Sequence, residues 1–208
     1  ERMKSDDFDW WKRRFFKMSD YFDAYRIDHI LGFFRIWEIS TQHVQSLLGH
    51  FSPALPLSEE EIIHQWRFPL KKEEMLKPFI HKDMLLSIFD EFSDEVQENY
   101  IEVIAANRYQ LKQFCNTQQK INQLFENSVD RKSTSIRDGL FALCAEVLFV
   151  PDPYTENAYH PRISAQSTHA YCQLSSEEKE AFNNMYNDFF YNRHNQFWYE
   201  HAMQKLPH

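Results

Sequence analysis

The chain has 208 residues, of which 43% are hydrophobic, and its 31 acidic against 23 basic side chains give a formal charge of −8. This composition predicts a globular protein and disfavours a disordered one. The negative charge repels phosphate backbones, which argues against nucleic acid as the main partner. No apolar stretch approaches the roughly 20 residues of a membrane span, and no signal peptide opens the chain, so no membrane association is expected.

The cysteines and histidines predict neither a disulfide framework nor a metal site. Cys115, Cys144 and Cys172 are odd in number and widely spaced, and the ten histidines show no metal-ligand spacing. We therefore expect no metal, no cofactor and a reduced, cytoplasmic setting. Only three glycines are present, which favours helices, while aromatic residues make up 16%. Such aromatics suit either a sugar-stacking surface or a packed helical core, and the core is the interpretation for most of them.

The N-terminal part predicts a helix followed by a short strand. Apolar residues at helical spacing indicate an amphipathic helix over 7–18, and residues 23–28 are expected to be extended. Side chains alternate across a strand, so Arg26 and Asp28 share one face. The guanidinium could then keep the carboxylate ionised and oriented, as a nucleophile requires. The spacing alone fits equally an exposed ion pair of little energetic value.

The middle of the chain predicts a series of short helices. Pro53 and Pro56 interrupt the chain, and Ser58 with Glu61 forms a capping box that starts a short helix. The segment 100–114 stays ambiguous between helix and strand, and the apolar, β-branched run 147–150 predicts a strand. Further helices are expected over 71–76, over 81–99 with a break near Ser93, over 116–127, and from Ser135 onward.

The last element is expected to be the longest helix. Ser175 and Glu178 form a capping box, and the helix can run to about Lys205, on the order of 45 Å. Its apolar side chains lie close to one stripe, which predicts a face turned toward the core. The members of the stripe are Phe182, Met185, Tyr186, Phe189, Phe190, Arg193, Phe197 and Ala202.

The segment from Tyr21 to Trp37 resembles the nucleophile strand of the 4-α-glucanotransferases of glycoside hydrolase family 77, the amylomaltases. The matching positions are Tyr21, Ala24, Arg26, Ile27, Asp28, His29, Gly32, Phe33 and Trp37. The aromatic, basic run 8–15 is similar to the helix before that strand. Cys115-Asn116-Thr117, His160-Pro161-Arg162 and the final aromatic helix resemble the long form of the enzyme, which carries a helical insertion after the strand.

This resemblance implies a retaining transfer between α-1,4-glucans. Asp28 would be the nucleophile, Arg26 would keep it ionised and aimed, and His29 would bind substrate hydroxyls. Trp37 and Arg162 are expected to be further substrate-binding residues. The substrate would be a malto-oligosaccharide or α-glucan. We also expect the protein to form a homo-oligomer. Glu38 lies too far along the chain from Asp28 to be expected as the second carboxylate.

The same resemblance predicts that the chain is an internal segment without activity of its own. The family's acid/base glutamate lies in a Gly-Glu-Asp-Leu-Gly run, and Gly32, Gly49 and Gly139 are followed by other residues. We therefore expect a mainly α fold, in which 1–40 is one helix and the nucleophile strand of a (β/α)₈ barrel. Residues 41–208 would be a helical insertion with a few short strands, ending in the long helix. The alternative is a non-catalytic helical module for oligomerisation or glucan docking.

Overall fold

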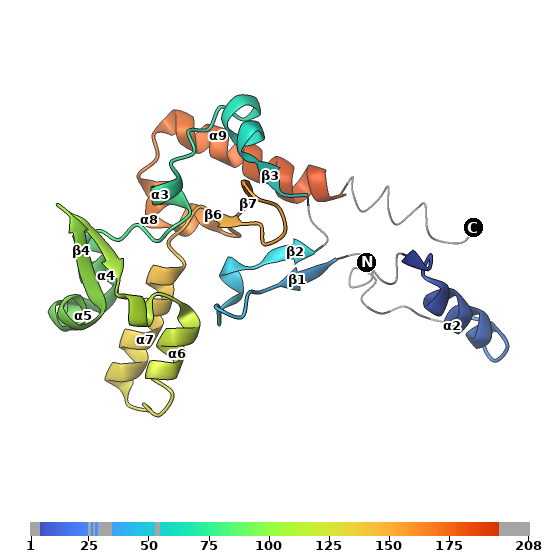
Figure 1. Cartoon of the computed structure of the whole chain (residues 1–208), viewed down its shortest axis with the longest axis horizontal. Coiled ribbons are helices and arrows are strands. Elements are labelled where there is room, and N and C mark those ends of the chain that lie inside the picture. The colour runs from blue at the N-terminus through green and yellow to red at the C-terminus, as the bar shows by residue number, and fades with distance from the viewer. Residues whose placement is uncertain (1–4, 25, 27, 29–34, 53–54, 196–208) are drawn as a thin grey trace. The chain divides into compact units, whose positions relative to one another are not determined.

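The computed structural model describes residues 5–24, 26, 28, 35–52 and 55–195. The chain divides into two units, Glu1–Phe34 and Arg35–His208, and each is treated by itself below. Helices prevail, as predicted, and the strands form three small antiparallel sheets (Figure 1). The described residues form no closed barrel.

The first unit contains the helix α2, Asp9–Ser19, which confirms the helix predicted over 7–18. Asp9 in its first turn and Lys17 in its last turn complement the helix dipole. No side chain of α2 is buried, and Trp10 and Phe16 are 53% and 78% exposed. Trp11 stacks on Phe15 with ring centroids 5.6 Å apart. The apolar residues at helical spacing in α2, such as Trp11 and Phe15, are half-buried, and Trp10 and Phe16 lie to either side of them.

The strand predicted over 23–28 does not appear among the described residues of that segment. None of the described residues Asp23, Ala24, Arg26 and Asp28 belongs to a strand. A strand is stable only when its backbone N–H and C=O groups pair with a neighbour. No strand among the described residues pairs with this segment, so the extended pattern in the sequence has nothing to form a sheet with.

The second unit holds the remaining regular elements. Its strands are β1 Ile36–Glu38, β2 His50–Ser52, β3 Leu57–Ser58, β4 Ile101–Ala105, β5 Arg108–Leu111, β6 Phe149–Pro151 and β7 Ala158–Pro161. Its α-helices are α3 Lys72–Met75, α4 Lys82–Phe89, α5 Ser93–Tyr100, α6 Gln118–Leu124, α7 Arg131–Cys144, α8 His169–Cys172 and α9 Ser176–Asn187. Short 3₁₀ or π turns are η2 Ser46–Leu48, η3 Glu61–Gln65, η4 Asp90–Phe92, η5 Gln113–Cys115, η6 Ala165–Ser167 and η7 Asp188–Arg193.

Two predicted capping boxes form, whereas α7 begins at Arg131, capped by Asp130, and not at the predicted Ser135. Ser175 and Glu178 exchange both capping-box hydrogen bonds at α9, and Ser58 and Glu61 do the same before η3. The break expected near Ser93 occurs at Asp90, whose φ is 47°. Helix α9 ends at Asn187 and continues as the π-helical turn η7. The end predicted near Lys205 lies outside the described residues.

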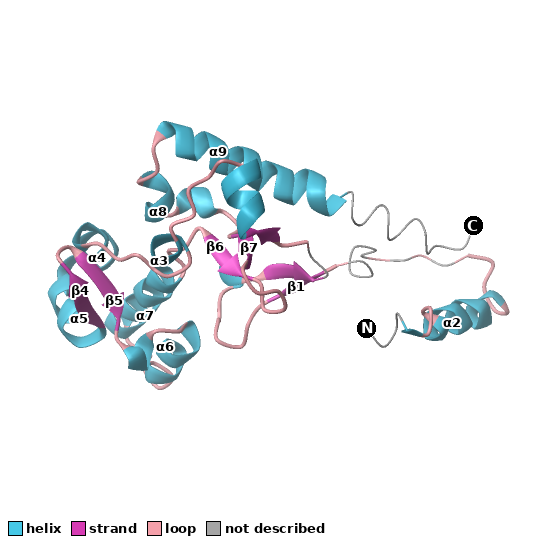
Figure 2. Ribbon diagram, turned by 45° about the horizontal axis from the view of Figure 1, so that its top comes forward, coloured by secondary structure: helices cyan, strands magenta, loops and turns pink. Residues whose placement is uncertain are grey.

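The ambiguous segment 100–114 is a β-hairpin. Strands β4 and β5 pair with Ile101 opposite Leu111 and Glu102 opposite Gln110. Alternation then places Ile101, Tyr109 and Leu111 on the buried face. This face packs with α4, α5, α6 and α7 into the first core, and the helices α4 and α5 lie beside the hairpin in both ribbon views (Figure 2).

Gly139 permits the close approach of α7 to α4. A Cβ atom at this position would lie 2.3 Å from a ring carbon of Phe89, which is buried in the same core. Any side chain larger than hydrogen must therefore displace a packed ring, and displacing core side chains destabilises a fold.

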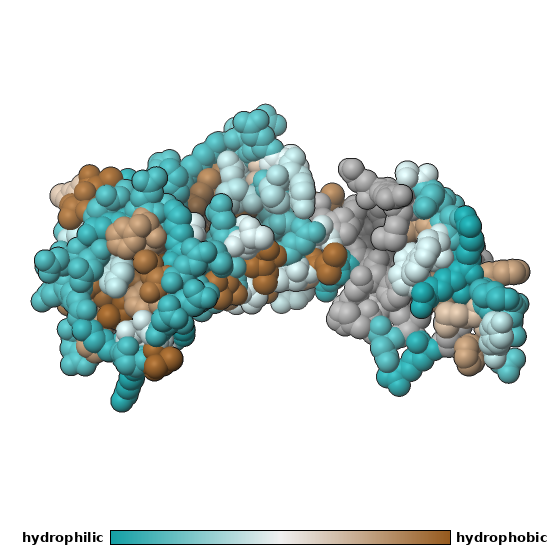
Figure 3. Space-filling model, turned by 60° about the horizontal axis from the view of Figure 1, so that its bottom comes forward, coloured by the Kyte–Doolittle hydropathy of each residue, from teal (hydrophilic) through white to brown (hydrophobic). Residues whose placement is uncertain are grey.

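A second core lies under α9, where the three-stranded sheet β3-β7-β6 meets the aromatic stripe. Phe182, Met185 and Phe189 are buried there, which confirms that the stripe faces the core. Phe182 contacts both Phe68 and Phe149 with ring centroids 5.6 Å apart. The face seen in Figure 3 is mainly hydrophilic with some hydrophobic patches.

Histidines join the β1–β2 hairpin to the sheet. His50 of β2 stacks on His160 of β7 with centroids 4.7 Å apart and planes 12° from parallel. His160 Nε2 lies 2.7 Å from Asp152 Oδ2, and both side chains are buried. His194 Nδ1 donates to the Phe189 carbonyl at 2.8 Å. Burial lowers the pKa of His160, and it lowers the pKa of His194 to about 4.

The close contact at Gly139 predicts the effect of a substitution. Gly139→Val should lower the free energy of unfolding by about 2 kcal/mol, because the side chain must displace Phe89. The measurement is urea unfolding followed by circular dichroism. Asp138→Ala, an exposed neighbour on the same helix, should change the free energy by no more than about 0.5 kcal/mol. A Gly139→Val protein as stable as wild type would contradict the packing of α7 against α4.

The buried histidines predict a loss of stability in mild acid. His194 is neutral in the folded protein until the pH approaches about 4, whereas an unfolded histidine takes up its proton near pH 6.5. Its contribution is therefore complete above pH 6.5 and falls by up to about 3 kcal/mol as the pH drops toward 4. His194→Asn should flatten the pH dependence of the urea midpoint in this window. The exposed control His64→Asn should keep the wild-type slope, and equal slopes in all three proteins would contradict the account.

Candidate functional site

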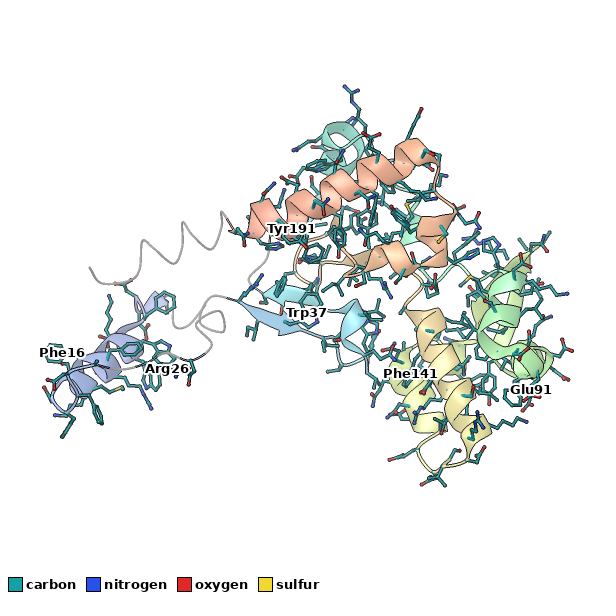
Figure 4. The ribbon with its side chains drawn as sticks, turned by 180° about the vertical axis from the view of Figure 1, so that it is seen from behind. Phe16, Arg26, Trp37, Glu91, Phe141 and Tyr191 are labelled. Atoms are coloured by element: carbon teal, nitrogen blue, oxygen red, sulfur yellow. The ribbon has the colours of Figure 1, made fainter. Side chains whose placement is uncertain are left out.

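The structure brings together the two side chains that the sequence pairs as a catalytic set. Arg26 Nε lies 2.7 Å from Asp28 Oδ1. Arg26 belongs to the first unit and is labelled in Figure 4. The side chains are 89% and 78% exposed, so the pair contributes little to stability in water. The contact places the guanidinium of Arg26 against one oxygen of the carboxylate. His29, the predicted contact to substrate hydroxyls, lies outside the described residues.

The other acids of the first unit are largely engaged with the cations of α2. Asp7 pairs with Lys12, Asp9 with Arg13, and Asp20 with Lys17. The hydrogen bond from Arg13 lowers the pKa of Asp9 below its usual value. A proton-donating acid needs a raised pKa, so Asp9 does not suit that role beside Asp28.

Trp37 packs inside the β1–β2 hairpin. It lies opposite Phe51 in the register, and the two rings meet edge to face at 4.7 Å. Its indole Nε1 donates to the Ser46 carbonyl at 3.0 Å. A Cβ atom on Gly49 would lie 2.3 Å from that nitrogen, so the indole rests against the glycine backbone. In this structure Trp37 holds the hairpin together, and its contact with substrate stays a prediction.

Arg162 points into the second unit, although it was predicted to bind substrate. It is 4% exposed, and its Nη1 donates to the carbonyls of Ile163 at 3.2 Å and Ser164 at 2.9 Å. Burial lowers the pKa of Arg162, and the carboxylate of Glu146 opposes this effect. Glu146 itself accepts from the His169 backbone N–H at 2.8 Å. In this conformation Arg162 ties together the loop after β7, and its glucan contact stays a prediction.

Two clusters in the second unit were not predicted from the sequence. Arg193 donates to Glu61 at 2.7 Å and to the carbonyls of Leu55 and Pro56, so it clamps η7 to the segment before β3. The buried pair of His160 and Asp152 is the second. In the sequence, Asp152 is a polar residue that follows Pro151. Its partner His160 lies on the next strand, β7. The pair of His160 and Asp152 is buried, whereas the side chains of Arg193 and Glu61 are partly exposed.

The described part of the chain has neither a candidate metal-binding cluster nor a candidate membrane-spanning helix. Among those residues, no group of three or more His, Cys, Asp or Glu side chains could hold a metal ion. In the same part of the chain no helix has the length and apolar character needed to cross a bilayer.

Comparison with known proteins identifies the family. The family model described as 4-alpha-glucanotransferase, glycoside hydrolase family 77, matches residues 1–207. The chain is 34% identical over 214 residues to the 4-alpha-glucanotransferase DPE2 of Oryza sativa subsp. japonica, covering 100% of this chain and 22% of that protein. The chloroplastic/amyloplastic 4-alpha-glucanotransferase of Solanum tuberosum is 39% identical over 57 residues, 26% of this chain and 10% of that protein.

A shorter match is to the 4-alpha-glucanotransferase of Chlamydia pneumoniae, 44% identical over 36 residues, which is 17% of this chain and 7% of that protein. The chain thus spans about a fifth of the length of its rice relative and less of the other two. No solved structure matches it. The family model covers almost every residue, and on this evidence the chain belongs to the 4-alpha-glucanotransferase family, glycoside hydrolase family 77.

Proposed function

We propose that this chain is part of a 4-α-glucanotransferase that transfers glucosyl units or glucan segments between malto-oligosaccharides. The observation that carries the proposal is the family match over residues 1–207, combined with the contact between Arg26 and Asp28. The chain covers 22% of its rice relative, so the activity is proposed for a longer protein that contains this sequence.

Within that protein we propose that residues 1–40 belong to the catalytic (β/α)₈ barrel and 41–208 to a helical insertion. The amphipathic pattern of α2 supports this division, because a barrel helix covers the strand ring with an apolar stripe. The segment around Asp28 would then become a strand between two barrel neighbours, which supply the hydrogen bonds that it lacks here.

The proposed chemistry has two steps at one anomeric carbon. Asp28 attacks that carbon, the glycosidic C–O bond breaks, and a separate carboxylic acid gives its proton to the departing sugar. In the second step the separate acid, now a carboxylate, takes the proton of the 4-hydroxyl of an incoming sugar. The oxygen of that hydroxyl bonds to the anomeric carbon, and the bond from this carbon to Asp28 breaks. Arg26 orients the Asp28 carboxylate for its attack, and His29 holds hydroxyls beside the bond that breaks. The two carboxyl groups must lie about 5 Å apart, as retention requires.

We propose that Trp37 and Arg162 contribute to substrate binding. The half-buried indole of Trp37 can offer a flat apolar face to a sugar ring, provided that the hairpin keeps its present packing. Arg162 is buried, so we propose that its effect on substrate binding runs through the loop it holds.

We also propose a cytoplasmic location and a homo-oligomeric state. The thiols of Cys115 and Cys144 are free and buried, and burial raises their pKa to about 11 and about 12, which suits a reducing compartment. The relative from Solanum tuberosum carries a chloroplastic/amyloplastic name, so a plastid location is the alternative that fractionation would separate.

The chain of 208 residues should have no transferase activity by itself. It contains no Gly-Glu-Asp run to supply the second carboxyl, and without general acid catalysis the rate falls at least about 10²–10⁴-fold. The measurement is glucose and maltotetraose production from maltotriose, with the full-length protein as the positive control. Transfer products from the chain alone would contradict the need for a second carboxyl outside it.

Asp28→Asn in the full-length protein should abolish transfer. An amide cannot act as the nucleophile, so we expect kcat with maltose and glycogen to fall at least about 10³-fold. Asp23→Asn, an exposed acid five residues away, is the matched control and should keep nearly full activity. Circular dichroism must show both variants folded. An active Asp28→Asn protein would instead favour a non-catalytic helical module for oligomerisation or glucan docking.

A further inference from the structure

A polar groove of about 600 Å³ lies on the outer face of the β4–β5 hairpin, in the second unit. Glu102 lies opposite Gln110 on this face, Ile104 lies at the register irregularity between Val103 and Ala105, and Arg108 pairs with Ala105. Further walls come from the end of α3 and from the turn η5. We call this feature the hairpin groove; it is lined by Glu73, Lys77, Glu102, Arg108, Gln110 and Gln113, among others.

Internal contacts fix the walls of the hairpin groove. The Tyr109 N–H donates to the Ile80 carbonyl at 3.0 Å, which ties β5 to the segment that follows α3. Arg108 Nη2 donates to the Glu73 carbonyl at 3.1 Å, and its guanidinium lies 4.9 Å from the centroid of the Phe79 ring. A site held in place by backbone and side-chain bonds loses little conformational entropy when a ligand binds.

The charges of the hairpin groove cancel, although the whole chain carries −8. Glu73 and Lys77 form an ion pair at 2.8 Å, and Glu102 and Arg108 contribute one charge of each sign. Such a lining gives no net attraction to a phosphate or to a polycation, because neither sign of charge dominates. The lining therefore favours a neutral ligand.

The polar groups also define the kind of neutral ligand. Gln113 offers an amide donor and an amide acceptor, Gln110 donates to Glu102 and keeps its amide oxygen, and Asn116 accepts from Lys120 and keeps its amide donors. Sugar hydroxyls both donate and accept, so they match this set. Pro78 and Ile104 add apolar surface that the C–H faces of a sugar ring can cover. The groove has the volume of a typical small-molecule site.

We propose that the hairpin groove binds a segment of neutral α-1,4-glucan, separate from the proposed catalytic aspartate. This site rests on the proposed function for the identity of the sugar, and it deepens that function by giving the second unit a substrate-holding role. A glucan held there would stay attached to the protein between transfers, which raises its local concentration.

The test is a titration of the ¹⁵N-labelled 208-residue chain with maltoheptaose, followed by NMR. We expect amide shift changes to cluster at residues 102–116 and 73–78. Gln110→Ala should weaken the affinity about three- to tenfold, the loss of one or two hydrogen bonds, and Glu102→Gln should weaken it similarly. Gln123→Ala and Glu98→Gln are exposed controls outside the groove and should leave the affinity unchanged.

Several results would overturn the proposal: no shift changes with maltoheptaose, shift changes elsewhere in the chain, or equal binding of cellohexaose, whose β-1,4 linkages give another shape. Unchanged affinity in folded Gln110→Ala and Glu102→Gln proteins would also overturn it. The titration involves no turnover. A negative titration would therefore not affect the assignment of Asp28 as the nucleophile. An active Asp28→Asn enzyme would likewise not affect the conclusion from a positive titration.

Discussion

Backbone hydrogen bonding is the constraint that distinguishes the extended segments of the two units. Each extended residue must place its N–H and C=O groups against a neighbouring strand or water. In the second unit every strand finds a partner within 35–195, so three small sheets form between the helices. Around Asp28 the described residues supply no partner strand, and the segment stays irregular. Each described strand of the second unit thus has its partner within that unit, whereas the described residues around Asp28 belong to no strand.

This difference matters for the proposed chemistry. The ion pair of Arg26 and Asp28 forms even without the strand, because two residues of spacing allow the guanidinium to reach the carboxylate in an irregular segment as well. Contact alone does not make a catalyst, since a nucleophile must also be held at a fixed distance from the acid and the sugar. In an exposed segment the pair has no such support. The surrounding barrel would supply it, which is why activity is assigned to a longer protein.

The sequence predicted the elements whose signals are local. Capping boxes at Ser58 and Ser175 and the aromatic stripe of α9 follow from a few neighbouring residues, and the structure confirms them. It could not predict what depends on distant partners. The hairpin at 101–111 is fixed by packing on α4 to α7, Arg162 turns inward because of Glu146 and the loop carbonyls, and His160 meets Asp152 across two strands. For the site, the contact of Arg26 with Asp28 was predictable, and the hairpin groove was not.

The most direct test of the central claim is to trap the covalent intermediate. The full-length protein would be treated with 5-fluoro-α-glucosyl fluoride, a donor whose fluoride leaves without a general acid and whose intermediate hydrolyses slowly. It would then be digested and mapped by mass spectrometry. The account predicts one added fluoroglucosyl group on the peptide that contains Asp28, and none in the Asp28→Asn protein. A label on another carboxylate, or a label that survives the substitution, would contradict the assignment of Asp28 as the nucleophile.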